Sequence, residues 1–279
     1  MTPHILFKFA SRSRPEKFFK AIDNIIYMID DKVNYTVLCT FDKDDVTMSE
    51  SNICDIAKNY PINIKSVYGN SANKIHAINR DMHLITDWDI LINMSDDMVF
   101  TEKGFDNIIR EDFLGDATIW AREANPNINW FKTYNFDQFL HYNDGNQKGN
   151  VSTMAIMGRQ YYDRFNYIYH PAYISVWCDV EQTDVAVMLG KYKYMGDSKI
   201  LFHHMHPAWG LASYDAQYRA SENLDVWGKD LMTIIERKEN NYGLHYDLLY
   251  PKYPMSDIER WKSDLNKTRI NNNLHPLIF

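Results

Sequence analysis

Residues 89–97 of the chain read DILINMSDD, a short apolar run that leads directly into two adjacent carboxylates. We expect Asp89–Met94 to form a buried strand and Ser95-Asp96-Asp97 to follow its carboxyl end. Three earlier runs have the same apolar or alternating character and are bounded by polar residues: His4–Phe9, Tyr35–Phe41 and Ile62–Tyr68. The sequence therefore predicts four strands before residue 98.

Helix-like segments separate these strands. Ser13-Arg14-Pro15-Glu16 has the pattern of a capping box, and apolar residues then recur at helical spacing from Phe18 to Ile29. Further helices are expected over Ser49–Asn59 and Ser71–Leu84. This alternation predicts an α/β fold with a doubly wound, mostly parallel sheet. Ligands of such sheets bind beyond the carboxyl ends of the strands, where the candidate polar groups of this chain follow.

The second half of the chain is less regular. Residues 125–150 are rich in Asn, Gly and aromatic residues and predict a long functional loop. Strands are expected over Val151–Gly158 and Ser198–His204, and helices over Asp179–Leu189 and Ser213–Lys238. No repeat or linker divides the chain, which favours one continuous domain up to about residue 240, followed by a C-terminal extension over 241–279.

Composition restricts the class of protein. The chain has 279 residues, 45% of them hydrophobic, which is typical of a globular protein, and no apolar run long enough for a membrane span. The start lacks the pattern of a secretory signal, and three widely spread cysteines favour a cytoplasmic location. A net charge of −7 does not indicate duplex nucleic acid as a partner. The aromatic content of 14% predicts either a large aromatic core or stacking surfaces.

Two acidic motifs are candidates for chemistry. Asp96 and Asp97 repel each other unless a cation lies between them, which favours a divalent metal that bridges to a diphosphate; a solvated turn is the alternative. Asp179 and Glu181 begin a predicted helix, where a carboxylate serves either as a general base or as a cap.

Basic and imidazole side chains complete the candidate set. His203, His204 and His206 lie within four residues, and His204 and His206 would share one face of a strand. A metal ligand, a zinc site and a hydrogen-bonded core histidine are the alternatives for this cluster. Arg12, Arg14 and Lys74 lie near predicted strand ends. A solvated surface is the usual place for such residues, but their gathering around one predicted crevice indicates binding of an anion. The absence of GxxxxGK[ST], GxGxxG and GxSxG argues against P-loop NTPases, Rossmann dehydrogenases and α/β-hydrolases.

Four segments together resemble the nucleotide-sugar glycosyltransferases of the GT-A fold. The chain is most similar to the family-two group, including its small bacterial and phage enzymes. Phe7–Pro15 resembles the first strand and nucleotide-binding turn, Ser71–Arg80 the GKxxAxN helix, Asn93–Asp97 the DXD region, and Cys178–Glu181 the ED motif. Two positions depart from the family pattern, because Met94-Ser95-Asp96-Asp97 lacks the first acid of DADD and Cys178 replaces the Glu of ED.

The resemblance implies a GT-A-like, Rossmann-like catalytic domain over 1–240, with a nucleotide-binding half at 1–100 and an acceptor half at 101–240. It implies a metal-dependent, inverting transfer from a UDP-sugar to an acceptor hydroxyl, with Asp179 as the base. Asp97 and His204 are the expected ligands of Mn²⁺ or Mg²⁺. The expected donor-binding residues are Ser11, Arg12, Arg14, Asp42, Lys74, Asn79 and Asp96. The expected acceptor-binding residues are Trp177, Glu181, His206 and Trp209.

The acceptor is expected to be a glycan or, as a second option, a modified base in phage DNA. Trp177 and Trp209, together with Trp130, Tyr134 and Phe136 of the 125–150 loop, would form a stacking platform for it. Two other functions are compatible with the residues. A nucleotidyltransferase would cleave a nucleoside triphosphate and release pyrophosphate, and a non-catalytic sugar-binding module of the same fold would bind without turnover.

Overall fold

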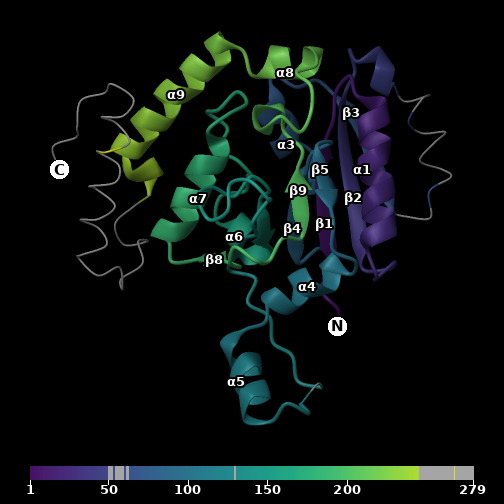
Figure 1. Ribbon diagram of the computed structural model, residues 1–279, viewed down its shortest axis with the longest axis vertical. Coiled ribbons are helices and arrows are strands. Elements are labelled where there is room, and N and C mark those ends of the chain that lie inside the picture. The colour runs from purple at the N-terminus through teal and green to yellow at the C-terminus, as the bar shows by residue number, and fades with distance from the viewer. Residues whose placement is uncertain (50–52, 54–59, 61–62, 129, 245–266, 268–279) are drawn as a thin grey trace.

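The computed structural model describes residues 1–49, 53, 60, 63–128, 130–244 and 267 (Figure 1). At its centre is a seven-stranded sheet with the order β3-β2-β1-β4-β7-β6-β8. The strands of this sheet are β1 Ile5–Ala10, β2 Tyr35–Asp42, β3 Ile64–Gly69, β4 Ile90–Met94, β6 Phe139–His141, β7 Ile156–Gly158 and β8 Tyr192–Tyr194. A separate pair consists of β5 Met98–Phe100 and β9 Phe202–His204.

The first four strands confirm the predicted parallel half of the sheet. β1 pairs in parallel with both β2 and β4, and β2 pairs in parallel with β3. The apolar residues of β1, β2 and β4 are buried on both faces, as expected for parallel strands covered by helices, whereas those of the edge strand β3 are half-buried. Because the strands run in one direction, the residues that follow Ala10, Asp42, Gly69 and Met94 all emerge at one edge of the sheet, and this edge carries the candidate groups.

The remaining strands make the sheet mixed. β7 is antiparallel to β4 and β6, whereas β8 is parallel to β6. The predicted loop over 125–150 is therefore wrong at Phe139–His141, which form a buried strand inside the sheet. β5 and β9 pair antiparallel, with Met98 opposite His204, so that the segment after Asp96-Asp97 lies beside the histidine cluster.

Helices cover both faces of the sheet (Figure 1). α1 and α4 pack on one face with an aromatic core, and α3, α6, α7 and α9 pack on the other. The α-helices are α1 Pro15–Met28, α3 Lys74–Asn79, α4 Phe105–Asp112, α5 Asp116–Ala124, α6 Arg159–Asp163, α7 Cys178–Met188, α8 Ala216–Ser221 and α9 Leu224–Glu239. Short 3-10 turns are η1 Val46–Met48, η2 Met82–Leu84, η3 Pro207–Trp209 and η4 Asn241–Gly243.

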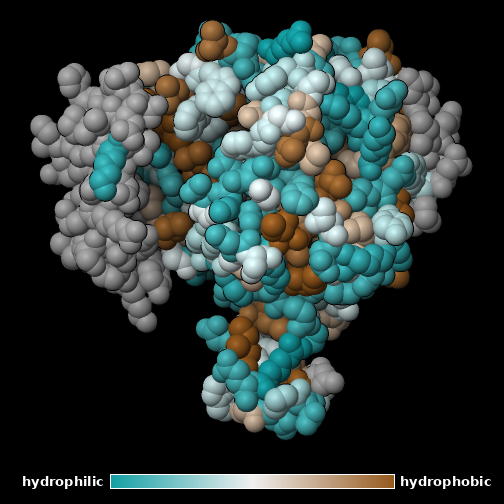
Figure 2. All heavy atoms as spheres, viewed as in Figure 1, coloured by the Kyte–Doolittle hydropathy of each residue, from teal (hydrophilic) through white to brown (hydrophobic). Residues whose placement is uncertain are grey.

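One segment projects from the body of the molecule. It contains α5, lies at the end opposite α8 (Figure 1), and is joined to the body where Leu114 and Tyr134 form a β-bridge. Figure 2 shows hydrophobic groups interspersed with hydrophilic ones on this projection. Trp120 and Trp130 are among its exposed side chains.

Several predicted helix boundaries are wrong. No capping box forms before α1, because Ser13 has a left-handed backbone (φ 58°) and Arg14 is the N-cap without a side-chain bond. The helix predicted over Ser71–Leu84 begins at Lys74 and ends at Asn79, because Arg80 is extended and Asp81 is left-handed (φ 71°). The helix predicted over Ser213–Lys238 is divided, because Asn223 caps a new helix by accepting from the backbone N–H groups of Asp225 and Val226.

Two predictions concern segments that lie almost entirely outside the described residues. The helix predicted over Ser49–Asn59 lies outside the described residues except for Ser49 and Ile53, as does the 241–279 extension beyond Leu244 except for Lys267. Among the described residues, none of the helices combines the length and the apolar character that a membrane crossing requires.

Candidate active site

The two adjacent carboxylates after β4 face different partners. Arg14 donates from Nη1 to Asp96 Oδ1 over 3.0 Å. Asp97 is buried; its Oδ2 accepts from the Tyr218 hydroxyl over 2.5 Å and lies 3.3 Å from His204 Nε2. Burial raises the pKa of Asp96 despite Arg14. Burial acts in the same sense on Asp97, but hydrogen bonds from His204, Ser95 and Tyr218 hold its pKa well below the ordinary value.

His204 is the histidine that joins this site. Its Nδ1 lies 3.7 Å from Asp144 Oδ2, so the ring stands between two carboxylates. Burial opposes the charged form of His204, but Asp144 and Asp97 raise its pKa to about 9. His203 points to the other face of β9, where its ring fills the space that a side chain at Gly145 would need. His206 Nε2 lies 3.2 Å from Glu222 Oε1.

Asp97 and His204 fit a metal ion. Asp97 Oδ1 is buried and has no hydrogen-bond partner, and the other oxygen of the same carboxylate lies beside the His204 imidazole. Carboxylate and imidazole ligands together suit Mn²⁺, and a carboxylate alone suits Mg²⁺. The described residues contain no group of three or more His, Cys, Asp or Glu that could hold a metal. The protein would thus supply part of a coordination shell that a bound diphosphate and water complete.

Asp179 lies in the first turn of α7, after Trp177, which has a left-handed backbone (φ 64°). One of its oxygens accepts from the Val180 N–H over 2.9 Å. Burial raises the pKa of Asp179, although Lys74 and His204 act in the opposite sense. Lys74 begins α3, is exposed, and makes no ion pair within the part of the chain that the structure describes. Asp179 thus lies close enough to Lys74 and to His204 for both positive charges to act on its carboxylate.

The ends of β1 and β2 form the other side of the site. Arg12 donates to Asp42 over 3.0 Å and to both oxygens of Asp44 over 2.7 and 2.8 Å. Ser11 Oγ and Asp42 Oδ1 are buried without a hydrogen-bond partner. Buried polar atoms are normally paired, so these two atoms are available to a ligand.

Three residues around α8 also reach the site, and the sequence analysis missed them. Asp215 accepts from Arg14 over 2.6 Å and from Lys17 over 2.7 Å. Tyr218 binds Asp97, and Glu222 lies at His206, as described above. Their only local signal is the Asp215 N-cap, which indicates a helix start and no partner.

Two predicted site residues have their side chains occupied elsewhere. The Asn79 amide oxygen accepts from the N–H groups of Ile168 and Tyr169, and its nitrogen donates to the Tyr169 carbonyl, so the side chain holds that segment in place. Glu181 is buried in an ion pair with Arg237, with both contacts at 2.6 Å. The predicted acceptor role of Glu181 is wrong in this geometry, because its carboxylate is inside the α7–α9 interface.

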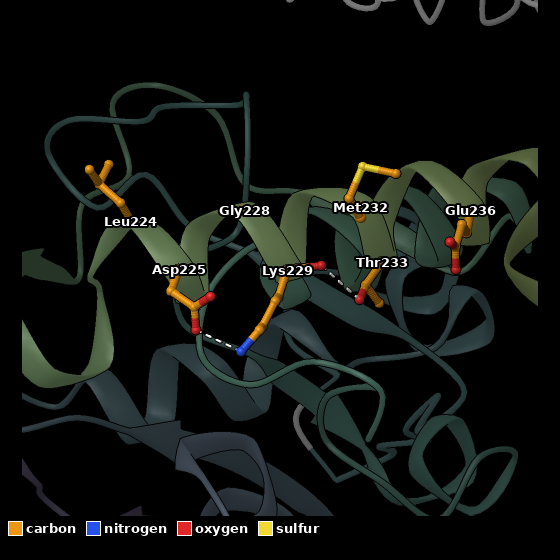
Figure 3. Close-up of a pocket in the computed structure, with 7 residues that line it drawn as sticks. All are labelled: Leu224, Asp225, Gly228, Lys229, Met232, Thr233 and Glu236. Carbon is orange, nitrogen blue, oxygen red and sulfur yellow. Dashed lines mark hydrogen bonds and ion pairs between the residues drawn. The ribbon is translucent and has the colours of Figure 1, made fainter.

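The predicted stacking platform does not form one surface. Trp177 packs edge-on against Trp227, with 5.5 Å between ring centroids, and Trp209 is 41% exposed on η3. Tyr134 and Phe136 stack on each other and pack against the core, whereas Trp130 belongs to the projecting segment. A separate open groove of about 550 Å³ runs along α9 from Leu224 to Glu236, and an Asp225–Lys229 ion pair lies beside it (Figure 3). It contains none of the predicted site residues.

Comparisons place the fold among known structures. No protein-family model matches the sequence, and comparison with curated proteins gives no match. The mannosyltransferase PcManGT from Pyrobaculum calidifontis, solved with GDP-Man and Mn²⁺, superposes with a TM-score of 0.52 at 11% identity. The match covers 75% of this chain and 60% of that one. S. aureus TarS 1–349, solved with UDP-GlcNAc, gives 0.53 at 10% identity over 84% and 66% of the two chains. These likenesses confirm the predicted GT-A-like, Rossmann-like fold.

Proposed function

We propose that this chain is a glycosyltransferase that moves a sugar from a nucleotide-sugar donor, with UDP-sugars as the first candidates, to an acceptor hydroxyl. The observation that supports it is the gathering of Asp97, His204, Asp179 and Lys74 at the strand edge where α/β sheets bind ligands. Two structures with this fold hold nucleotide sugars. The chain spans only about 60 to 66% of their lengths, so substrate and partners are inferred from its own residues.

The donor would lie across the carboxyl ends of β1, β2 and β4. Ser11 and Asp42 offer their unpartnered oxygens to the nucleoside, and Arg14 and Lys74 face the diphosphate. Asp97 and His204 would hold Mn²⁺ or Mg²⁺, with Asp96 beside them. The bound metal supplies Lewis-acid stabilisation of the charge that develops on the leaving diphosphate.

Asp179 is the proposed base. In its ionised form it accepts the proton of the acceptor hydroxyl, whose oxygen attacks the anomeric carbon as the bond to the diphosphate breaks. A direct in-line displacement of this kind inverts the anomeric centre. A glycan is the proposed acceptor, and the half-buried Trp177 at the start of α7 and the exposed Trp209 on η3 are the proposed contacts for its rings.

Thermal unfolding with UDP, UDP-sugars and nucleoside triphosphates, each with and without Mn²⁺, tests this function. Ligand at 100 times its dissociation constant stabilises the native state by about 2.7 kcal/mol, which is roughly 5 °C or more for a domain of this size. We expect such a shift with UDP and Mn²⁺, its loss in Asp97→Asn, and its retention in the surface control Asp163→Asn.

Other outcomes separate the two alternatives. A shift with nucleoside triphosphates alone, together with release of pyrophosphate, would favour a nucleotidyltransferase. A shift with UDP-sugars but no hydrolysis or transfer, unchanged in Asp179→Asn, would favour a binding module. No shift with any nucleotide would remove the donor site from the proposal.

A further inference from the structure

Asp144 lies behind His204 on the turn that follows β6. Its side chain is 2% exposed, and both of its carboxylate oxygens accept hydrogen bonds from neighbouring residues. Oδ1 accepts from the N–H groups of Asn146 over 2.8 Å and Gln147 over 2.6 Å. Oδ2 accepts from the Thr153 hydroxyl over 2.9 Å. The carboxylate is therefore fixed before any ligand binds.

The same turn also holds the backbone of His204. The His204 N–H donates to the Asp144 carbonyl over 3.1 Å, and the Asn146 amide donates to the His204 carbonyl over 3.3 Å. The turn that contains Asp144 and Asn146 therefore contacts both the backbone and the ring of His204. The imidazole has Asp144 on its Nδ1 side at 3.7 Å and Asp97 on its Nε2 side at 3.3 Å.

The Nδ1 atom of the His204 ring lacks a hydrogen bond. His204 Nδ1 is buried and has no hydrogen-bond partner, although Asp144 Oδ2 is the carboxylate oxygen that faces it. The two atoms are 3.7 Å apart, so a hydrogen bond between them would need the ring to move toward Asp144. An imidazole that donates from Nδ1 to a carboxylate keeps its lone pair on Nε2, which is the nitrogen that faces Asp97.

We propose that Asp144 is a positioning residue that holds the Nδ1 proton of His204 and so presents Nε2 to the metal of the donor site. This inference rests on the proposed function, which assigns His204 to that metal. Carboxylates that accept from a metal-bound histidine fix its tautomer and orientation, and their loss typically weakens metal affinity about 10- to 100-fold. Asp144 does not touch the donor; it acts only through His204.

The test is Asp144→Asn. An asparagine can keep the hydrogen bonds of the turn, but it reverses the direction of the hydrogen bond between residue 144 and His204 Nδ1. Its amide oxygen can accept from Asn146 and Gln147, while its amide nitrogen takes the place of Oδ2 and donates to His204 Nδ1. The proton of the ring is then forced onto Nε2. In the presence of saturating UDP, we expect Mn²⁺ affinity, measured by electron paramagnetic resonance of free Mn²⁺, to fall about 10- to 100-fold. UDP affinity without metal is expected to stay the same.

Two controls separate positioning from a structural role. Thr153→Val removes another donor to the same carboxylate and is expected to leave Mn²⁺ affinity within about two-fold. In a His204→Ala background, Asp144→Asn is expected to cause no additional loss, because the histidine through which it acts is gone. An equal loss in both backgrounds would mean that Asp144 only holds the turn.

Nitrogen NMR of the unsubstituted protein with Mg²⁺ and UDP gives a readout that needs no variant to fold. We expect His204 to carry its proton on Nδ1, and a proton on Nε2 alone would overturn the inference. Failure here and failure of the proposed function are distinguishable. If Asp97→Asn abolishes Mn²⁺ binding but Asp144→Asn leaves it unchanged, the inference fails and the donor site stands. If the unsubstituted protein binds no Mn²⁺ with UDP, both the metal assignment and the inference fail.

Discussion

The surroundings of the candidate site shift the pKa values of two of its carboxylates in opposite directions: that of Asp97 is lowered and that of Asp179 is raised. Hydrogen bonds from three side chains keep the pKa of Asp97 low, which maintains an anion able to bind a cation. Burial raises the pKa of Asp179 against the opposing effects of backbone N–H groups and of the charges on Lys74 and His204, so that its ionised form is a stronger base. This difference in pKa suits Asp97 to the proposed role of metal ligand and Asp179 to that of proton acceptor.

Asp179→Asn is the corresponding prediction. The amide cannot accept the acceptor proton, so kcat should fall about 10²- to 10⁴-fold while donor affinity changes little. In the unsubstituted protein, kcat should rise with pH as Asp179 ionises, with a midpoint above the ordinary carboxyl value of 3.8. Steady-state kinetics over pH 4–8 measure both effects. Transfer within a few-fold of the unsubstituted rate would remove Asp179 as the base.

Lys8 is a buried cation that the candidate site does not use. It lies in β1 with 0% exposure and donates to Thr40 Oγ1, and the Thr40 hydroxyl donates to Asp81 over 3.0 Å. Burial lowers its pKa to about 7. Between pH 7 and about 10.5 the unfolded chain therefore binds more protons at this residue than the folded protein. Its contribution to stability rises with pH in this window, by up to about 1.4 kcal/mol per pH unit.

Lys8→Met is expected to remove this dependence. Since both states carry the charge below pH 7, the cost of burying it is largest there, and the variant should be more stable at pH 6 by about 1–3 kcal/mol. Urea unfolding at pH 6, 7.5 and 9 measures it, with Lys20→Met on the exposed face of α1 as the control. An unchanged slope with pH in Lys8→Met would contradict the assignment.

At the scale of elements, a buried ion pair joins α7 to α9. Glu181 accepts from Arg237 through two contacts and from the Tyr173 hydroxyl over 2.8 Å. Asp179 lies one half-turn away on the same helix, so this pair also fixes where the proposed base stands. Of the two carboxylates in the Asp179–Glu181 segment, Asp179 is the one proposed for the site, and Glu181 stabilises the packing of α7 on α9.

Glu181→Ala should destabilise the protein by about 3 kcal/mol, because it leaves Arg237 and Tyr173 without their buried partner. Denaturant unfolding measures the loss, and Glu236→Ala, an exposed carboxylate of α9, is the matched control. Binding of UDP to the folded protein should be unchanged. Stability within about 0.5 kcal/mol of the unsubstituted protein, with a raised acceptor KM, would instead return Glu181 to the acceptor site.

For the whole molecule, the mixed sheet joins the two halves of the chain. β4 pairs with β1 on one side and with β7 on the other, so the hydrogen-bond ladder runs from residues 1–100 into residues 101–240. The two apolar clusters on the faces of the sheet also draw residues from both halves. Continuity of this kind supports one cooperative unit over the described residues.

We therefore expect a single unfolding transition. Circular dichroism, which reports all helices, and tryptophan fluorescence should give the same urea midpoint. UDP with Mn²⁺ should move both midpoints together, because the donor site uses residues of both halves. Two separated midpoints would show that residues 1–100 and 101–240 unfold as independent units.

The sequence by itself determined strands β1 to β4, the helix that follows β1, and the place of the acidic pair. Periodicity and strand ends are local properties, so they locate β1 to β4 and the turn that carries Asp96 and Asp97. It did not determine helix ends such as those at Asp81 and Asn223, where a left-handed backbone or a local cap breaks an apolar pattern that continues through it.

Only the tertiary structure decided which side chains meet. Tyr218 reaches Asp97 across 121 residues, and Arg237 reaches Glu181 across 56. The choice of His204 over His203 follows from the pairing of β5 with β9, which turns one ring toward Asp97 and the other toward Gly145. Such contacts depend on how elements pack, and no local pattern encodes the partner. A carboxylate that reads as a site residue in sequence can therefore prove to be part of the core.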